Sequence, residues 1–372
     1  MPQWIWQRRR WPRFSWDEAA ISAPLARARL AQGRVLGAVG ILDPTLTNEA
    51  VAAVLVGEGL ATSAIEGERL DVKAVRSSVA RHLGLPSAGL AAPPRSVDGL
   101  VEVLLDATRN HRTPLTVERL CRWQAALFPT GQSGLRRIRT GALRGEDPMQ
   151  VVSQRAGRER VHFVAPSRDR LEREMRRFLE WFADPPARLD GLQRAGLTHL
   201  WFVTLHPFED GNGRIARALT DMALAQDERQ TQRFFSLSAR IEQEREAYYD
   251  VLERTQRGDL DVTPWLSWFL EQTATACEYA EATVSRVLVK ARFWLRYQGT
   301  SLNDRQRKVL NRLLDAGPGG FEGGITTRKY SSLTRVSRAT AYRELADLVE
   351  KGCLESAGRG GRSRAYAIRW DA

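Results

Sequence analysis

Cysteine, lysine and long apolar runs are all scarce in this sequence of 372 residues. The three cysteines, Cys121, Cys277 and Cys353, are odd in number and far apart, which argues against a disulfide framework or a zinc knot. The longest apolar stretches, such as residues 50–56, fall well short of the roughly 18 residues that a membrane span needs. Residues 1–11 contain no apolar segment followed by a small-residue cleavage site. We therefore expect a cytoplasmic protein with no membrane partner.

Basic residues outnumber acidic ones, and arginine supplies nearly all of them. Lys plus Arg number 56 against 44 Asp plus Glu, and only five of the 56 are lysine. Residues 301–372 hold 14 basic and 8 acidic residues, so half of the net charge of +12 lies in about a fifth of the chain. This distribution predicts a separate C-terminal unit and makes a polyanion the first partner to consider. An apolar share of 43% is enough for a sizeable globular core.

Apolar residues at helical spacing dominate the chain and predict a mainly α fold. Only residues 151–153 and 161–164, separated by polar residues, are typical of a hairpin. The length predicts two or three domains, which we place at residues 1–95, 96–297 and 298–372. Helices are expected at residues 49–59, 62–70, 116–128, 168–183, 189–205, 214–227, 241–257 and 263–298.

The first sixteen residues alternate aromatic and basic side chains, including Trp4, Trp6 and Trp11. Such interleaving is found in proteins that bind single-stranded nucleic acid. It equally suits short strands that place aromatic rings under a helical body, and we favour this second interpretation.

The densest group of chemically active residues is His206–Arg217. Pro207 disfavours helical geometry at His206, so the preceding helix should end there and leave the imidazole at the entrance of a loop. Gly211 and Gly213 allow backbone N–H groups to converge just before the next helix, at its positive end. This pattern predicts an anion-binding nest.

Further side chains of this segment suit a magnesium–nucleotide site. Arg214 and Arg217 lie three residues apart on one helix face, and their planar forks match phosphate oxygens. Asp210 can hold Mg²⁺ against a polyphosphate, and Asn212 adds an uncharged donor. An unperturbed histidine is suited to act as general base for a hydroxyl nucleophile. Each feature alone is usually structural, but their combination within twelve residues predicts a base beside a phosphate site.

The segment resembles the Fic-family motif HPFx(D/E)GN(G/K)RxxR at every specified position. The Trp-rich start, the stretch 237–270 and the C-terminal module are similar to those of a bacterial subgroup of that family. The resemblance implies a Fic-type helical core with a small β-hairpin flap, and transfer of AMP from ATP to a Tyr, Thr or Ser hydroxyl of a target protein or of the chain itself. Glycine at position 213, where the kinase-like branch has lysine, favours adenylylation over phosphorylation.

The same resemblance implies a role for each position of the motif. His206 would deprotonate the target hydroxyl, and Asp210 would bind Mg²⁺. An anion hole would form from Gly211, Asn212 and Gly213. Arg214 and Arg217 would contact the phosphate chain of ATP, and Phe208 would anchor the loop.

The resemblance extends to a second motif, an inhibitory pattern that Thr62, Glu66 and Gly67 fit. A carboxylate at Glu66 would pair with Arg217 and occupy the position that a productive γ-phosphate needs. In some relatives this glutamate also positions water for the removal of AMP, so a de-AMPylating activity stays open.

Two further sets of residues are assigned by position in that family. The strand Val161, His162, Phe163 and Val164 would dock the target segment by strand addition, with a purely structural hairpin as the alternative. Tyr248, Tyr249 and Gln256 would contact the nucleotide base or ribose, with a place in the core as the alternative.

The C-terminal residues predict a winged helix-turn-helix-like module. Ser337 is a good N-cap for a helix that presents Arg338, Tyr342 and Arg343, as a recognition helix does in a major groove. Residues 358–364 would form a basic wing tip. DNA binding and protein docking both stay open, as does a homodimer. The alternative function is a DNA-binding regulator whose Fic-like core senses a nucleotide.

Overall fold

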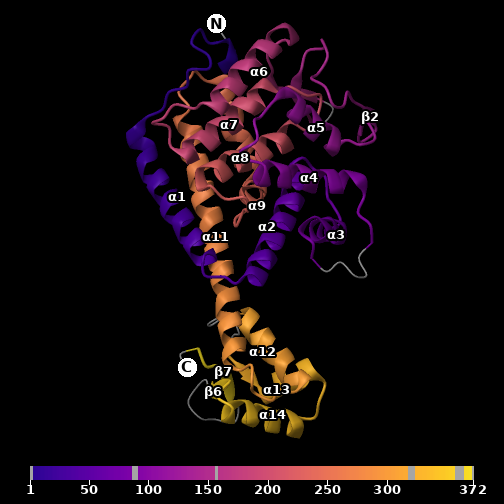
Figure 1. Cartoon of the computed structure of the whole chain (residues 1–372), viewed down its shortest axis with the longest axis vertical. Helices are drawn as coiled ribbons and strands as arrows, with labels where there is room; N and C mark the ends of the chain where they lie inside the picture. The colour runs from indigo at the N-terminus through magenta and orange to yellow at the C-terminus, as the bar shows by residue number, and fades with distance from the viewer. Residues whose placement is uncertain (1–2, 86–90, 156–157, 317–322, 357–363, 371–372) are drawn as a thin grey trace. The chain divides into compact units, whose positions relative to one another are not determined.

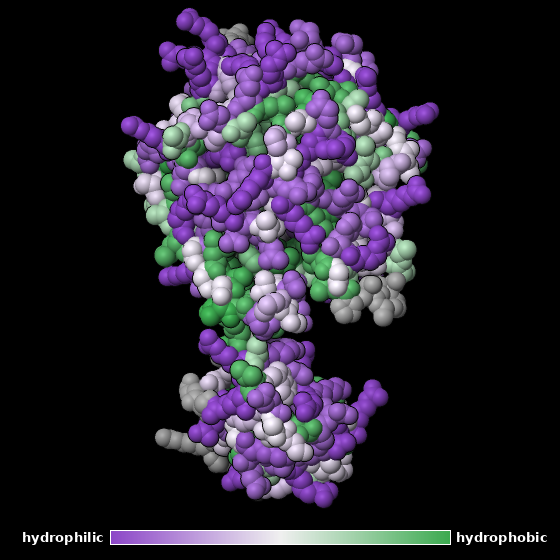
Figure 2. Space-filling model, in the orientation of Figure 1, coloured by the Kyte–Doolittle hydropathy of each residue, from purple (hydrophilic) through white to green (hydrophobic). Residues whose placement is uncertain are grey.

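The computed structural model describes residues 3–85, 91–155, 158–316, 323–356 and 364–370. The chain forms two compact units, residues 1–281 and 282–372 (Figure 1). Helices prevail in both, as predicted, while the domain boundaries drawn from the sequence stay predictions. Within the described residues no helix is long and apolar enough to cross a membrane. The visible face of each unit is mainly hydrophilic (Figure 2).

Unit 1 begins with the short 3₁₀ helix η1 (Ile5–Gln7) and is otherwise built from helices and two small hairpins. The helices are α1 (Glu18–Val39), α2 (Pro44–Ile65), α3 (Val72–Leu83), α4 (Arg95–Arg109), α5 (Val117–Leu127), α6 (Arg168–Ala183), α7 (Gly191–Leu205), α8 (Asn212–Glu228), α9 (Leu237–Gln243), α10 (Arg245–Arg257) and the start of α11 (Thr263–Arg296). The hairpins are β1 (Gln132–Ser133) with β2 (Arg136–Arg137), and β3 (Gln150–Arg155) with β4 (Arg158–Val164).

The helices α7 and α8 form the centre of unit 1 (Figure 1). Every residue of α7 from Leu192 to Leu205 is buried, and α8 is buried almost throughout. A helix that is enclosed on all sides belongs to the core rather than to the surface. The loop that joins these two helices, residues 206–211, is therefore held by the most rigid part of the unit.

The segment that carries the expected inhibitory motif forms one helix and not two. We expected helices at residues 49–59 and 62–70, but α2 runs without a break from Pro44, and the side chain of Asp43 caps it by accepting hydrogen bonds from the N–H groups of Thr45 and Leu46. The proline stands in the first turn, where no N–H is needed. The helix ends at Glu66 because Gly67 adopts a left-handed conformation with φ 85°.

Helix α2 is fixed to the rest of unit 1 by a buried carboxylate. Glu58 accepts hydrogen bonds from the hydroxyl groups of Ser236 and Ser238 and from the backbone N–H of Ser238. These serines stand at the start of α9, where Ser236 is also the N-cap. The contact sets the rotation of α2 two turns before Glu66, and so directs its C-terminal end toward the loop after α7.

The aromatic N-terminus packs under the helical body, as we favoured, although it forms turns and a 3₁₀ helix rather than strands. Trp4 stacks edge-on against Phe163 at 5.3 Å between ring centroids, and both rings are buried. Trp6 donates to the carbonyl of Val164, and Trp11 donates to the carboxylate of Glu174. Since Trp4 and Trp11 are buried in the core, these two rings are not available for stacking on bases.

Unit 2 contains the end of α11, then α12 (Asp304–Ala316), β5 (Ile325–Thr326), α13 (Thr327–Thr334), α14 (Arg338–Glu350), β6 (Leu354–Ser356) and β7 (Ala365–Ile368). Its three strands form a sheet in the order β5-β7-β6. Ser337 caps α14 as predicted. Most of the expected wing tip lies outside the described residues, and the winged-helix assignment stays a prediction.

The acidic residues of α14 do not all lie on its basic face. Glu344 is buried and accepts hydrogen bonds from Arg305 and from the hydroxyl of Tyr330. Arg338, Tyr342 and Arg343 are exposed. The face expected to read a groove is therefore present, while DNA binding itself stays a prediction.

Candidate active site

His206 is the C-cap residue of α7 and adopts a left-handed conformation, with φ 48° and ψ 57°. The helix ends here as predicted, because Pro207 cannot continue it. The ring Nδ1 lies 3.3 Å from the carbonyl oxygen of Val203. A carbonyl only accepts, so Nδ1 carries the hydrogen and Nε2 keeps its lone pair. This is the tautomer that a general base needs.

The environment of His206 favours the neutral imidazole. Burial lowers the pKa of His206, and the positive charge of Arg144 lowers it further. The hydrogen bond to Val203 and the charges of Glu66 and Asp210 act in the opposite direction, but the pKa still lies below its usual value. The ring is thus ready to accept a proton at neutral pH.

The loop after His206 is closed by a side chain that we expected to face phosphate. The amide of Asn212 accepts from the N–H of Phe208 and donates to its carbonyl, at 2.9 and 2.8 Å. Phe208 is fully buried and anchors the loop, as the resemblance implied. Because both ends of the Asn212 amide are engaged, only its backbone N–H is free to serve an anion hole.

The first turn of α8 is open to an anion. Gly211 is its N-cap, with φ 88°, and no side chain caps the free N–H groups there. A Cβ at position 211 would lie 2.9 Å from the ring of Phe128, so both space and conformation require glycine. The predicted nest is therefore present at a helix N-terminus that has no acidic residue in its first turn.

Arg214 and Arg217 extend from α8 beside this nest, as predicted. The Arg214 guanidinium lies over the ring of Phe128, 4.7 Å from its centroid. The Arg217 side chain is only 2% exposed, and its Nε donates to the hydroxyl of Thr62 at 2.7 Å. Two buried nitrogens, Nε of Arg214 and Nη1 of Arg217, have no partner among the described residues. Both can still donate to a ligand.

The predicted pair between Glu66 and Arg217 is formed. Nη2 of Arg217 donates to Oε1 of Glu66 at 2.7 Å and to the carbonyl of Thr62 at 2.8 Å. Burial alone would lower the pKa of Arg217, but the negative charge of Glu66 raises it above its usual value. A Cβ at Gly213 would lie 2.1 Å from the same Oε1. The carboxylate thus lies against the nest itself.

Asp210 lies at the edge of the loop with both carboxylate oxygens in hydrogen bonds. One accepts from the N–H of Gly211 at 2.6 Å, and the other accepts from the hydroxyl of Ser133. Among the described residues no three His, Cys, Asp or Glu side chains gather as a metal cluster. A single carboxylate fits Mg²⁺ nonetheless, since this ion is commonly held by one or two carboxylates together with substrate phosphates.

Sequence reasoning missed three contacts of the site. Glu68 places a second carboxylate 3.3 Å from Nη1 of Arg214. Ser133 binds Asp210, and Arg144 binds the carbonyl of His206. Only the contact of Glu68 could have been suspected from the sequence, because Glu68 stands two residues after Glu66. Ser133, in the short strand β1, and Arg144, in the segment after β2, stand in no sequence pattern that points to the site.

The residues expected at the base or ribose are engaged within the chain. Tyr248 is buried and its hydroxyl lies 2.8 Å from Nε2 of His199. Tyr249 donates to the carbonyl of Ile65, and Gln256 donates to the hydroxyl of Thr204. Tyr249 thereby contacts the C-terminal end of α2. Their role toward a nucleotide stays a prediction.

The expected docking strand is β4, paired antiparallel with β3. Phe163 points into the cluster with Trp4, and His162 lies 2.7 Å from a carboxylate oxygen of Glu253. The carbonyls of Val161 and Val164 accept hydrogen bonds from Arg257 and Trp6. The hairpin is present, and its back is fixed by the N-terminus and by α10, while target docking stays a prediction.

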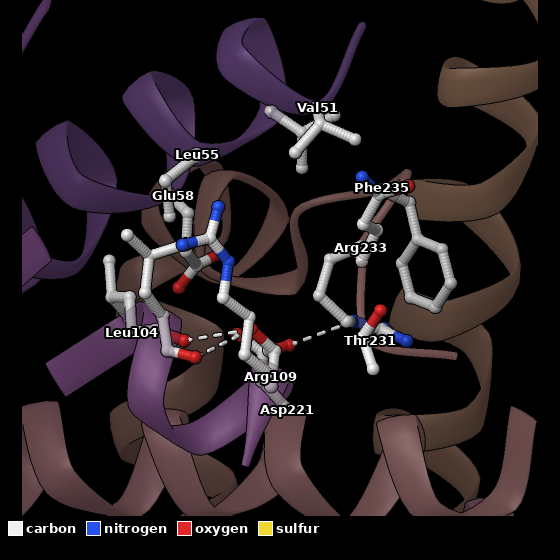
Figure 3. A pocket seen from close by; sticks show the side chains of 13 residues that line it. Val51, Leu55, Glu58, Leu104, Arg109, Asp221, Thr231, Arg233 and Phe235 are labelled. Atoms are coloured by element: carbon white, nitrogen blue, oxygen red, sulfur yellow. Dashed lines mark hydrogen bonds and ion pairs between the residues drawn. The ribbon is translucent and has the colours of Figure 1, made fainter. Parts of the chain in front are cut away.

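A separate small cavity of about 30 Å³ lies between α2, α4 and α8 (Figure 3). It holds none of the predicted site residues. Buried Glu58 and Asp221 face Arg233 there, and burial together with the charge of Glu58 raises the pKa of Asp221. This volume holds about one water molecule. The cavity therefore belongs to the attachment of α2 and not to the loop after α7.

Comparison with known proteins agrees with this geometry. The Fic/DOC family matches residues 114–224, which include the whole loop, and the domain of unknown function DUF4172 matches residues 4–85. A protein adenylyltransferase Fic from Nematostella vectensis is 35% identical over 98 residues, which are 26% of this chain and 22% of that relative. The match thus spans about a fifth of the relative's length.

Two solved structures share the fold at low sequence identity. A Fic family protein from Desulfovibrio desulfuricans G20 has a TM-score of 0.54 at 20% identity, covering 95% of this chain and 97% of the other. A Fic domain containing signaling protein from Bacteroides thetaiotaomicron VPI-5482 has a TM-score of 0.52 at 16% identity, covering 70% and 97%. The family match identifies residues 114–224 as a Fic/DOC-family domain, and the two solved structures share the fold of the chain.

Proposed function

We propose that the protein is an autoinhibited protein adenylyltransferase that moves AMP from Mg-ATP to a hydroxyl group of a protein. The observation that carries this proposal is the position of His206 at the end of α7, just before the uncapped first turn of α8, where Arg214 and Arg217 each keep a buried donor without a partner among the described residues. A base beside a phosphate cradle suits transfer to a hydroxyl, in which positioning and charge stabilisation provide most of the rate.

The proposed step follows from the residues around the loop after α7. The target hydroxyl oxygen attacks the α-phosphorus of ATP, and its proton passes to Nε2 of His206. The bond between the α-phosphorus and the bridging oxygen breaks, and pyrophosphate leaves. Arg214, Arg217 and the N–H groups of the first turn of α8 stabilise the negative charge on the phosphates. Mg²⁺ bound at Asp210 would neutralise part of that charge.

Two acid–arginine contacts support autoinhibition as part of the proposal. Glu66 binds Arg217 and Glu68 binds Arg214, so each arginine that would hold the phosphates faces a carboxylate of the same chain. A triphosphate and these carboxylates compete for the same donors. The exposed fraction of the Glu68 side chain is 48%, against 33% for Glu66, so Glu66 is the stronger competitor.

The test uses ATP labelled at either the α- or the γ-phosphate, with a Glu66→Gly background to raise the signal. We expect label from α-labelled ATP, and none from γ-labelled ATP, to become attached to protein. His206→Ala in that background should lower incorporation by about a hundredfold or more, the usual contribution of a general base. Nucleotide binding should persist. Full transfer by the His206→Ala variant would contradict the assignment.

A further inference from the structure

Arg144 is a buried arginine that forms no ion pair with a described residue. It lies in the segment between β2 and β3, and it is 1% exposed. Burial lowers the pKa of its guanidinium, and no carboxylate of a described residue lies within ion-pairing distance. Burying a charge without an acidic partner is costly, so the hydrogen bonds of this guanidinium have to offset that cost.

All contacts of Arg144 converge on the turn that carries His206 and on the end of the flap strand. Its Nε donates to the carbonyl of His206 and its backbone N–H donates to the carbonyl of Pro207, both at 2.9 Å. Its Nη2 donates to the carbonyl of Pro166, which follows β4 by two residues. One side chain therefore joins the catalytic turn to the base of the β3–β4 hairpin.

The backbone of the turn explains why an outside donor is needed. His206 has a left-handed backbone conformation, so its carbonyl group no longer points along the axis of α7. Pro207 and Pro166 have no backbone N–H, so neither residue can donate a backbone hydrogen bond to a neighbouring carbonyl. A planar guanidinium holds its donors in a rigid fork, whereas a lysine ammonium is a point charge with rotatable donors on a flexible stem.

We propose that Arg144 is a positioning residue of the transfer reaction, which holds the His206 turn and the flap in one fixed relation. The inference rests on the proposed function. It assigns Arg144 no contact with the reacting atoms. Arg144 would act on the rate by fixing the direction of the imidazole toward the hydroxyl that the flap presents, and small misplacements of a reacting group are costly.

Arg194 offers a matched control within the same unit. It is also buried, its Nη2 donates to the carbonyl of Phe182 at 2.8 Å and to Gln226 at 2.7 Å, and burial lowers its pKa in the same way. None of these partners belongs to the loop after α7. Loss of Arg194 therefore reports the cost of removing a buried arginine, without any change at His206.

The experiment compares Arg144→Gln, Arg144→Lys and Arg194→Gln in the full chain, each with Glu66→Gly. AMP incorporation from labelled ATP is measured between about pH 5 and 8, together with nucleotide binding and thermal unfolding. We expect Arg144→Gln to lower the rate about tenfold to a hundredfold. It should also move the acid limb of the rate profile to higher pH, because the positive charge that lowers the pKa of His206 is gone.

The conservative variant separates charge from geometry. Arg144→Lys keeps the charge, so its acid limb should stay in place while its rate falls. Arg194→Gln should lower the melting temperature and move neither the rate per folded molecule nor the acid limb. If Arg144→Gln does not fold, full activity of Arg144→Lys would overturn the inference.

The outcomes distinguish this inference from the proposed function. If the Glu66→Gly parent transfers AMP and Arg144→Gln matches Arg194→Gln in rate and pH profile, the role of Arg144 is refuted and the function stands. If the folded parent binds nucleotide and transfers no AMP, the function is refuted and the role of Arg144 falls with it.

Discussion

Replacement of Glu66 by glycine removes the carboxylate that now occupies a donor of Arg217. The residue is the C-cap of α2, with φ −81° and ψ 2°, so glycine adopts its backbone conformation without strain. Glu58 still fixes α2 through Ser236 and Ser238, so the helix stays in place. The perturbation therefore changes one side chain at the nest and leaves the scaffold intact.

The size of the effect follows from the contact that is lost. Nη2 of Arg217 lies 2.7 Å from Oε1 of Glu66, in a pair whose arginine is 2% and whose glutamate is 33% exposed. Hydrogen bonds to charged groups are worth about 1.5 to 3 kcal/mol. Partial exposure of Glu66 favours the lower end, and about 1.5 to 2 kcal/mol corresponds to a roughly 10- to 30-fold rise in the population with Arg217 free.

The assay is incorporation of α-labelled AMP at saturating Mg-ATP, normalised to the amount of folded protein. Glu66→Gln is the matched control, since it keeps the shape of the side chain and removes only its charge, and its rate should fall between those of wild type and Glu66→Gly. His206→Ala in the glycine background sets the baseline. Rates of wild type and Glu66→Gly within about twofold, above that baseline, would refute the competition argument.

Two further predictions concern the second acidic contact and the base. Glu68→Gln should raise AMP transfer by no more than about threefold, because ion pairs with an exposed partner are weak. A rise as large as that of Glu66→Gly in the same assay would show that Glu68, and not Glu66, is the main competitor for the phosphate site. Burial and the charge of Arg144 lower the pKa of His206, so its imidazole stays neutral below the usual titration range of histidine. The rate of the Glu66→Gly variant should therefore begin to fall only at a pH below about 6.5, the usual pKa of a histidine side chain. A rate that already falls above that pH would show that His206 is charged in the folded protein.

The site could be predicted from the sequence where its residues are neighbours along the chain. His206–Arg217 includes the helix end at proline, the nest and both arginines, and each follows from local rules on Pro, Gly and helix spacing. The local rules did not show that the side-chain amide of Asn212 closes the loop, and the role of Asn212 toward a phosphate stays a prediction. An asparagine that binds the backbone of its own loop cannot be distinguished, from the sequence alone, from one that binds a ligand.

Contacts over long sequence distances could not be predicted from local rules. Glu66 meets Arg217 across 151 residues, and only the family resemblance placed them together. Arg144 donates to the backbone carbonyl of His206, 62 residues away. Because every residue has a backbone carbonyl, the sequence does not show which one accepts this hydrogen bond. The aromatic N-terminus shows the same limit. It forms turns instead of the expected strands, and the indole N–H groups of Trp6 and Trp11 bind partners far along the chain, Val164 and Glu174.

The pairing of Glu66 with Arg217 joins two helices of one chain, α2 and α8. A contact between two parts of one polypeptide has an effective concentration in about the millimolar range, set by the connection and not by the amount of protein. Occupation of Arg217 by Glu66 is therefore independent of dilution. A ligand or partner that displaces α2 must overcome this local concentration, whereas a cut in the chain between the two helices would turn the α2 segment into a dissociable peptide.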